Sequence, residues 1–461
     1  MRMKILVCLT ILINSCSNLV IGQDDHWFQK GMNAADPNEK IKYFTKSIEK
    51  EDLDASAYNH RGKAKSDLQD DQGAIEDYNK AIEIDPKNTD AYYNRGLVKV
   101  YLLDYQEAVT DFDKAIELNP EFADAYVSRG FTEINLQDYQ KALADFDRAI
   151  ELNPGYVNAY IGCGTTKNIQ QDYQGAIVEF DKAIELDPKN ANAHKTLGTV
   201  KMNLQDYPGA IADFDRAIEL DPQDSNAYYL RGTSKIMTGD YKGVIADFDK
   251  AIELNPDYAD AYYNRGSAKG YLQDYPGAIA DFDKVIELSP NYADAYFYRG
   301  MVYYFQKEYD QSIADMTEYI SLDSINPEAF NSRGWYYLIQ SKYDSALADF
   351  NKAISLKPDY SIAYGNMGYT YLQLNNFDLA KENLQKAILY DENFVIATVN
   401  LAIVYYMQGN KSEAKKYLTE AKTLKPRLLL GMEGIDQLEK KGFLWTQRDK
   451  ETLAKMFEEL K

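Results

Sequence analysis

Hydrophobic and small residues along this chain recur in paired helical patterns that are separated by short turns. In residues 261–272 the positions of Tyr262, Gly266 and Lys269 share one face of a helix, because successive helical residues are about 100° apart. A second helical pattern opens at Pro276, which a helix tolerates in its first turn because the missing amide hydrogen would have no partner there. The pattern predicts two helices that pack closely through glycine on the first and small residues on the second.

This helix pair repeats with a period of 34 residues, and glycine marks the period. The glycines are Gly62, Gly96, Gly130, Gly164, Gly198, Gly232, Gly266, Gly300, Gly334 and Gly368. Ala402 occupies the next position of this period, so eleven repeats run from residue 55 to residue 428. Stacked helix pairs bury a continuous core between neighbours. We therefore expect one elongated array rather than several globular domains.

The repeats resemble the tetratricopeptide repeat, whose signature is W-x2-L-G-x2-Y, then A-x3-F, then P. An aromatic residue fills the tryptophan position at Tyr58, Tyr92, Tyr126, Tyr160, Tyr228, Tyr262, Tyr296, Phe330 and Tyr364. The resemblance implies an all-α fold, an α-solenoid of antiparallel helix pairs wound into a right-handed superhelix. It also implies a concave surface lined by the first helix of each repeat.

Seven repeats depart from the signature by carrying arginine where the family usually has leucine before the glycine. These residues are Arg61, Arg95, Arg129, Arg231, Arg265, Arg299 and Arg333. The same repeats carry an aspartate in the second helix, at Asp77, Asp111, Asp145, Asp247, Asp281, Asp315 and Asp349. We predict that each arginine pairs with the aspartate of its own repeat and joins the two helices. The alternative is that these arginines contact a ligand.

Both ends of the array are irregular. Residues 24–54 form a degenerate first repeat, and residues 429–461 are about as long as one repeat but lack the signature. Thr446 and Asp449 form a capping-box pattern for a last helix. Its apolar face carries Leu453, Met456, Phe457 and Leu460. We predict that this segment caps the last repeat, because terminal repeats of solenoids are atypical. A docking helix for a partner or for a second copy is the alternative.

Residues 1–22 resemble a secretory signal peptide, with a basic start and an apolar run over residues 5–13 that is too short to span a bilayer. Residues 20–22 offer small side chains for ordinary signal cleavage. Cys16 ends a segment that resembles a bacterial lipobox, so lipid anchoring is the alternative. Both routes predict export to the periplasm, cell envelope or extracellular space. Cys163 is the only cysteine beyond this segment, so we expect no disulfide within the array.

Aromatic side chains occupy the face of the first helices that lies opposite the buried stripe. The candidate binding residues are Tyr93, Phe131, Tyr229, Tyr263, Tyr271, Phe297, Tyr304, Trp335 and Tyr369. Acids begin these helices at Asp90, Asp124, Asp260, Asp294 and Glu328. Such a surface suits a peptide or helix with basic and apolar side chains, since tyrosine offers a large contact area. The alternative is structural, because the helix dipole favours acids at helix starts without any ligand.

Charge and residue spacing exclude several classes of function. The formal net charge of −21 repels nucleic acid and anionic lipid and steers basic partners towards the chain. The histidines His26, His60 and His194 are widely separated and lack zinc-ligand spacing. In the D-F-D motif at 281–283, residues two apart on a helix point about 200° apart and cannot share an ion. We expect no metal, no cofactor and no catalytic activity.

The sequence thus predicts a scaffold or adaptor in the cell envelope, which binds a partner peptide or helix in the concave groove. Two alternatives stay open. One is a structural protein that associates with its own copies as a homo-oligomer. The other is a non-catalytic regulatory subunit of an enzyme complex.

Overall fold

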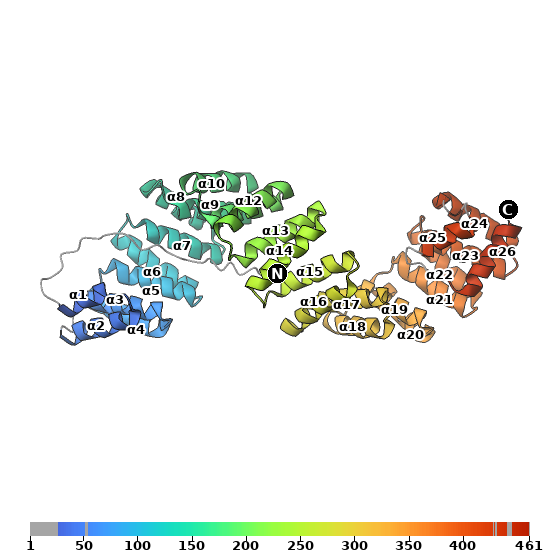
Figure 1. The fold of residues 1–461 in the computed structure, drawn as a ribbon, viewed down its shortest axis with the longest axis horizontal. Coiled ribbons are helices and arrows are strands. Elements are labelled where there is room, and N and C mark those ends of the chain that lie inside the picture. The colour runs from blue at the N-terminus through green and yellow to red at the C-terminus, as the bar shows by residue number, and fades with distance from the viewer. Residues whose placement is uncertain (1–25, 51–53, 427, 429–430, 440–444, 461) are drawn as a thin grey trace. The chain divides into compact units, whose positions relative to one another are not determined.

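The computed structural model describes residues 26–50, 54–426, 428, 431–439 and 445–460. Over these residues the chain forms 26 helices and no strand (Figure 1), which confirms the predicted all-α fold. The predicted signal segment, including Cys16, lies outside the described residues. Contacts divide the chain into two compact halves, an N-terminal half Met1–Leu220 and a C-terminal half Asp221–Lys461.

The N-terminal half consists of helix pairs in which each helix packs against the next in the chain. Its helices are α1 (His26–Asn33), α2 (Pro37–Lys50), α3 (Ala55–Asp67), α4 (Asp71–Ile84), α5 (Thr89–Tyr101), α6 (Tyr105–Leu118), α7 (Ala123–Asn135), α8 (Tyr139–Leu152), α9 (Val157–Ile169), α10 (Tyr173–Leu186), α11 (Ala191–Asn203) and α12 (Tyr207–Leu220).

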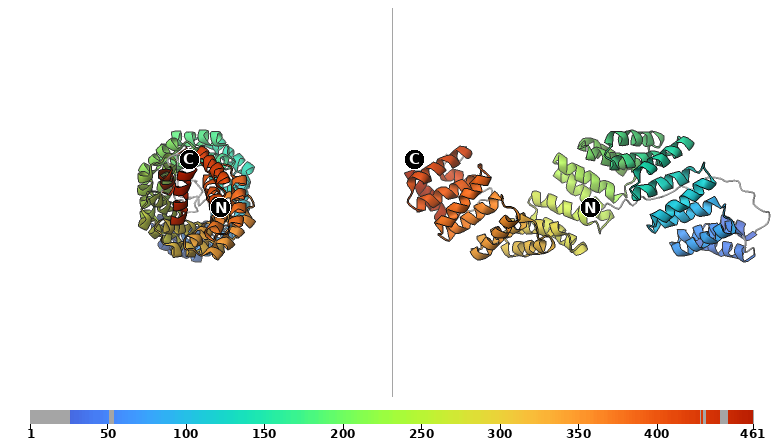
Figure 2. Two further views of the ribbon diagram at one scale, coloured as in Figure 1. Left: turned by 90° about the vertical axis from the view of Figure 1, so that its right-hand side faces the viewer. Right: turned by 180° about the vertical axis from the view of Figure 1, so that it is seen from behind.

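The C-terminal half continues the same alternation of helices (Figure 2). Its helices are α13 (Ser225–Thr238), α14 (Tyr241–Leu254), α15 (Ala259–Tyr271), α16 (Tyr275–Leu288), α17 (Ala293–Phe305), α18 (Tyr309–Leu322), α19 (Pro327–Ile339), α20 (Tyr343–Leu356), α21 (Ser361–Gln373), α22 (Phe377–Tyr390), α23 (Val395–Met407), α24 (Lys411–Leu424), α25 (Met432–Glu439) and α26 (Gln447–Glu459).

Every one of the eleven repeats has one residue with positive φ in the turn between its two helices. In nine of them this residue is not glycine: Gln69, Leu103, Gln137, Gln171, Gln205, Gln273, Lys307, Ser341 and Asn375. Gly239 and Gly409 fill the position in the other two. The next residue often caps the second helix, as where the Asp274 carboxylate accepts from the Gly277 amide at 3.2 Å. The turn therefore has the same form in each repeat.

Glycine in the first helix lies against a large side chain of the second helix. A Cβ atom added to Gly96 would lie 2.7 Å from the ring of Phe112, and one added to Gly334 would lie 2.8 Å from Phe350. Both rings are fully buried. The prediction of close packing is confirmed. Glycine faces the small residue of the second helix, since a Cβ atom added to Gly334 would also lie 3.2 Å from the Ala346 carbonyl oxygen, but it faces a large side chain as well, which the prediction left out. Glycine makes room for the aromatic ring at the centre of the repeat.

The predicted arginine–aspartate pairs are present in all seven repeats. In the repeat 259–292, Arg265 Nε donates to Asp281 Oδ2 at 2.9 Å and Nη2 donates to Oδ1 at 2.5 Å. Asp281 is buried at 3% exposure. Lys269, one turn after Arg265, places its Nζ 2.8 Å from Asp281 Oδ2. The pair is therefore a bidentate clamp between the two helices, and a lysine completes it.

Candidate binding surface

The nine candidate residues divide between the two halves. In the N-terminal half, the Tyr93 ring lies 4.8 Å from that of Phe122, and its hydroxyl is 3.3 Å from Ser128 Oγ in the next first helix. Burial raises the pKa of Tyr93 to about 12. Phe131 packs edge-on against Phe146 at 5.0 Å. Both candidates therefore hold helices together as well as lining the first-helix face.

Tyr229 and Tyr263 occupy the same position in their repeats and are packed in the same way. The Tyr229 ring lies 4.8 Å from Tyr258, and its hydroxyl accepts from Asn264 Nδ2 at 3.0 Å. The Tyr263 ring lies 5.2 Å from Tyr292 and 5.7 Å from Tyr298 in the first helix of the following repeat. Each ring therefore bridges its own repeat and the following one, a structural role that the sequence analysis left as an alternative.

Tyr271 lies apart from the other candidates of the C-terminal half. It ends α15 with 68% of its surface exposed, and its ring stacks on Tyr241 at 4.3 Å. It lines neither of the two hollows described next.

Phe297, Tyr304 and Trp335 come together in one hollow of 540 Å³ on α17 and α19, here called the aromatic hollow. The Tyr304 ring stacks on Tyr336 at 5.2 Å, and Trp335 Nε1 donates to the Tyr304 hydroxyl at 3.3 Å. The further lining residues are Tyr298, Met301, Phe305, Glu328, Asn331, Ser332, Tyr360 and Ile362. Three candidates from two consecutive repeats thus line one hollow.

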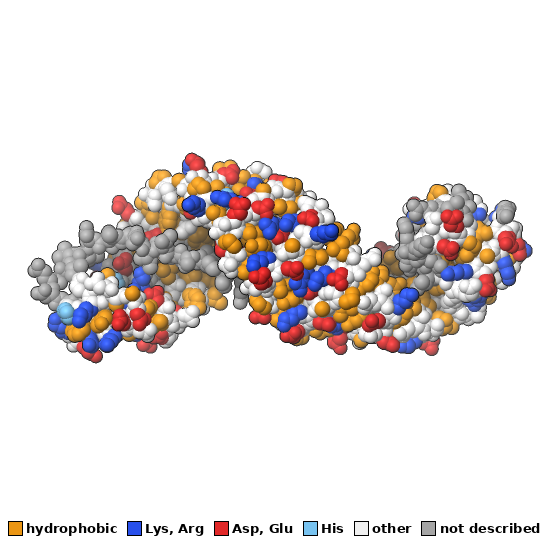
Figure 3. Space-filling view, viewed as in Figure 1, with side chains coloured by type: hydrophobic (Ala, Val, Ile, Leu, Met, Phe, Trp, Pro, Cys, Tyr) orange, Lys and Arg blue, Asp and Glu red, His pale blue; other side chains and the backbone are white. Residues whose placement is uncertain are grey.

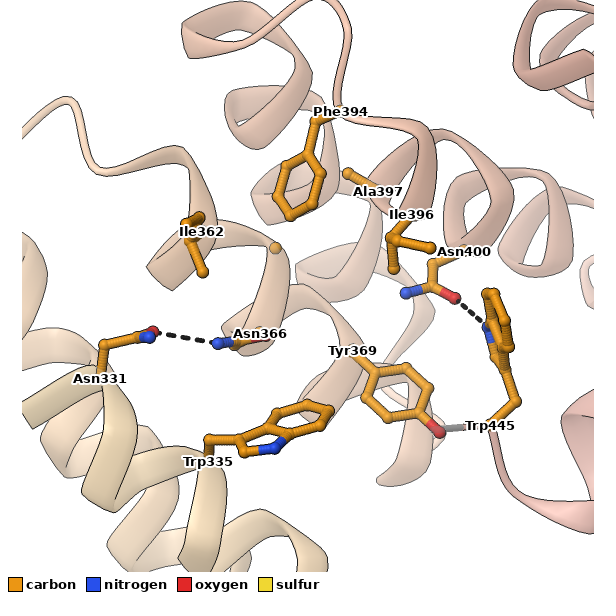
Figure 4. Close-up of a pocket in the computed structure, with 11 residues that line it drawn as sticks. Asn331, Trp335, Ile362, Asn366, Tyr369, Phe394, Ile396, Ala397, Asn400 and Trp445 are labelled. Carbon is orange, nitrogen blue, oxygen red and sulfur yellow. Dashed lines mark hydrogen bonds between the residues drawn. The ribbon is translucent and has the colours of Figure 1, made fainter. Parts of the chain in front are cut away.

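Trp335 and Tyr369 line a second hollow of 340 Å³, here called the apolar hollow, shown in Figure 4. It lies among α19, α21, α23 and Trp445. Its other lining residues are Asn331, Ile362, Gly365, Asn366, Phe394, Ile396, Ala397 and Asn400. The amide of Asn366 donates to that of Asn331 at 3.0 Å across one wall. The two hollows adjoin, because Trp335, Asn331 and Ile362 line both.

The C-terminal segment Trp445–Leu460 supplies one wall of the apolar hollow. Trp445 is buried, and its Nε1 donates to Asn400 Oδ1 at 2.8 Å (Figure 4). Asp449 is fully buried and accepts from the Tyr369 hydroxyl at 3.0 Å and from Gln373 Nε2 at 2.9 Å. The segment therefore lies on the first helices of the last two complete repeats.

The start of α26 matches the sequence-based prediction. Thr446 and Asp449 form the expected capping box. Leu453 and Met456 are fully buried within the core of the last repeats. Trp445 is not among the predicted site residues, although an indole just before a capping box and an apolar helix face is a usable signal for a packed segment.

The acids at the starts of the first helices differ in how they are held. Asp124 accepts a hydrogen bond from the Tyr156 hydroxyl, and Asp260 accepts one from Tyr292 at 3.1 Å. Burial and the neighbouring carboxylate raise the pKa of both tyrosines. Glu328 is exposed and lines the aromatic hollow. It is the single charged residue among the described residues that line either hollow.

None of the described helices is both long and apolar enough to cross a bilayer. Within the same residues, no group of three or more histidine, cysteine or acidic side chains is placed to hold a metal ion.

The paired helices and their fixed period define an α-solenoid, a class that presents extended concave surfaces to partners. Models described as tetratricopeptide repeat or TPR repeat match residues 62–100, 89–122, 123–156, 169–232, 237–270, 259–292, 282–314, 327–360, 362–394 and 397–429. The chain belongs to the tetratricopeptide repeat family, whose fold is that of a protein-interaction scaffold. None of the matching models describes a catalytic domain.

Several solved structures are similar to parts of the chain. The protein YrrB, titled a TPR protein with an unusual peptide-binding site, is 29% identical over 43% of this chain and 97% of its own, with a TM-score of 0.34. A tetratricopeptide repeat protein from Parabacteroides merdae is 21% identical over 52% of this chain and 97% of its own, with a TM-score of 0.46. Yeast Tom70 is 19% identical over 88% and 99%, with a TM-score of 0.37. No curated protein sequence matches this chain significantly.

Proposed function

We propose that the protein is a scaffold or adaptor that binds a peptide or helix of a partner protein on the first-helix face of its C-terminal half. The observation that carries this proposal is the pair of adjoining hollows, in which aromatic side chains from successive repeats face open space. Aromatic residues that are half-buried and rigidly supported provide much of the binding energy at protein interfaces. Catalysis has no part in the proposal.

The charge of the chain supports a basic and apolar partner segment. The net charge is −21, and the only charged residue that lines either described hollow is the acid Glu328. On the face shown in Figure 3, acidic and basic side chains of the C-terminal half are intermingled with hydrophobic ones. The net charge would therefore attract a basic partner at long range, and the hollows would select its side chains at contact.

We also propose that the chain is exported to the cell envelope. The support is the signal-like segment 1–22, with Cys16 as the alternative lipid-anchoring point. Fractionation of the source cells, with N-terminal sequencing of the mature chain, tests this. A chain that begins at residue 23 indicates simple cleavage, one that begins at lipid-modified Cys16 indicates an anchor, and an unprocessed cytoplasmic chain overturns the proposal.

The binding proposal is tested by affinity capture from an envelope fraction with the mature chain and with a Tyr304→Ala, Trp335→Ala variant. Tyr271→Ala is the matched control, because Tyr271 is an exposed tyrosine that lines neither hollow. We expect one partner to be retained by the parent and the control and lost by the variant, at equal helical content by circular dichroism. Equal capture by all three contradicts the proposal. A mass that rises with concentration and no captured partner indicates self-association instead.

A further inference from the structure

The apolar hollow is built by two separate parts of the chain. The repeats contribute side chains from α19, α21 and α23, and the segment Trp445–Leu460 contributes the indole of Trp445. That indole is fixed by its hydrogen bond to Asn400, which is itself 3% exposed. A repeat array alone would leave this side of the hollow open. The C-terminal segment is therefore part of the concave surface as well as a cover for the core.

The apolar hollow has the size and lining for one large hydrophobic side chain. Its volume is 340 Å³, whereas an apolar cavity of about 150 Å³ is enough to bind benzene. No charged residue is among the described residues that line it. Trp335, Phe394 and Trp445 form walls that surround the open space (Figure 4). An aromatic or branched aliphatic side chain would fit there and be shielded from water by these walls.

The adjoining aromatic hollow has the lining that attracts a cation. Tyr298, Tyr304, Trp335 and Tyr336 present rings, and Glu328 supplies a carboxylate. The described lining contains no lysine or arginine. A guanidinium or ammonium group over the face of an aromatic ring is attracted by the ring, and a nearby carboxylate adds to this attraction. An uncharged or acidic side chain gains neither contribution.

We infer that the two hollows form one bipartite site for an extended protein segment, in which arginine or lysine fills the aromatic hollow and a large apolar side chain fills the hollow closed by Trp445. Alternate side chains of an extended segment point to the same side, so the two residues would stand next but one to each other. Trp335, the shared wall, contacts both. The inference rests on the proposed function and names the chemistry of its ligand.

Tryptophan emission gives a direct measurement of this site. The chain has three tryptophans, and two of them, Trp335 and Trp445, line the apolar hollow. Trp27→Phe in the full mature chain leaves only these two. The probes are short blocked peptides of glycine and serine that carry arginine and, next but one, phenylalanine. Matched peptides replace the phenylalanine with alanine or the arginine with glutamate.

We expect the arginine–phenylalanine peptide to shift the emission and to bind at least about tenfold more tightly than either matched peptide. Glu328→Gln should remove the preference for arginine and leave the preference for phenylalanine. Glu318→Gln is the matched control, because Glu318 is an exposed acid on α18 outside both linings. Trp445→Ala should remove the preference for phenylalanine and leave that for arginine, and Trp445→Phe should restore most of it.

Equal binding of all three peptides, or binding of none, overturns the inference. So does a preference that Glu328→Gln and Trp445→Ala leave unchanged. The capture experiment separates this failure from that of the proposed function. If a partner depends on Tyr304 and Trp335 but the peptides show no selectivity, the binding surface stands and its bipartite chemistry is wrong. If neither experiment depends on the hollows, both are wrong.

Discussion

The repeats 259–292 and 123–156 place the same clamp in different electrostatic surroundings. In the first, Asp281 accepts from Arg265 and also faces Lys269. In the second, Asp145 accepts from Arg129 at 2.7 Å, but Glu133 takes the place of the lysine. Glu133 is 4% exposed, and its Oε2 has no hydrogen-bond partner among the described residues. The repeat thus tolerates an acid at a position that holds a lysine in five further repeats. These lysines pair with an acid of the second helix, and they are Lys65, Lys99, Lys167, Lys201 and Lys235.

This difference indicates that the stability of the clamp depends on the charge at the lysine position as well as on the geometry of the arginine–aspartate pair. Burial, followed by the nearby Asp145 carboxylate, raises the pKa of Glu133 to about 7. A protonated Glu133 can donate to Asp145, as the lysine does to the clamp aspartate in the repeats that carry one. An ionised Glu133 adds a third negative charge beside Arg129, which already pairs with Asp145 and Asp113. The repeat 123–156 is therefore expected to be sensitive to pH where the repeat 259–292 is not.

The largest expected effect is the loss of the clamp aspartate. Asp281→Ala leaves Lys269 half-buried without this partner and Arg265 with only Asp249 of the preceding repeat, and should destabilise the repeat by about 3 to 5 kcal/mol. Asp145→Ala should cost less, because it also relieves the repulsion with Glu133. Thermal unfolding and hydrogen exchange of α15 and α16, compared with α7 and α8, measure the two losses. Equal losses would contradict the comparison.

Replacement of the whole clamp sharpens this result. The double variant Arg265→Leu, Asp281→Leu removes both paired charges and leaves only Lys269 without Asp281, so it should recover part of the stability that Asp281→Ala loses. Its control is Arg265→Leu alone, which leaves Asp281 facing only Lys269. A double variant as unstable as the single variants would mean that the ion pair itself is needed for packing.

The next effect concerns pH. The folded pKa of Glu133 lies above its ordinary value of 4.5, so its contribution to stability is complete below about pH 4.5 and is lost as pH rises through about 7. We expect about 1 to 3 kcal/mol less protection of α7 and α8 at pH 8 than at pH 5. Glu133→Lys should abolish this dependence and stabilise the repeat at pH 8. A parent chain with a flat profile in hydrogen exchange would show that Glu133 is ionised throughout.

A smaller effect is expected where the C-terminal segment meets the repeats. Tyr369→Phe removes one donor from the buried Asp449 carboxylate and should weaken the packing of α26 by about 1 to 2 kcal/mol. Limited proteolysis near residue 445 should then become faster, while α15 and α16 keep their protection. Tyr364→Phe, a partly buried tyrosine in the same helix, is the control. An unchanged proteolysis rate would mean that the remaining hydrogen-bond donors are enough to keep Asp449 in place.

The smallest effect concerns the turns within the repeats. Gln273 has φ of 64°, a conformation that costs non-glycine residues energy, whereas Gly239 fills the same position with φ of 78°. Gln273→Gly should change stability by no more than about 0.5 kcal/mol, because relief of strain offsets the greater freedom of the unfolded chain. Gly239→Ala should cost about 1 kcal/mol. Thermal unfolding of both variants checks the contrast, and equal shifts would contradict it.

The period, the helix pairs and the clamps could be predicted from sequence because they repeat. Each glycine, arginine and aspartate recurs at one position, so a pattern seen once can be checked in the next repeat. The binding surface was less predictable. Tyr229 and Tyr263 share a position in the repeat that the period identifies, but their contacts with the next repeat depend on packing that periodicity does not encode. Trp445 was missed because it occurs once, outside the repeats.

The clamps also determine how such a chain can change in length. Arg265 Nη1 donates to Asp249 of the preceding repeat at 2.6 Å, and Arg299 Nη1 bonds Asp283 in the same way. Each of these repeats therefore carries a donor for the neighbour before it and an acceptor for the neighbour after it. Duplication or deletion of one 34-residue repeat in this part of the chain would again place the arginine of one repeat beside the aspartate of the repeat before it. The number of repeats can therefore change in evolution without any new type of contact between neighbouring repeats.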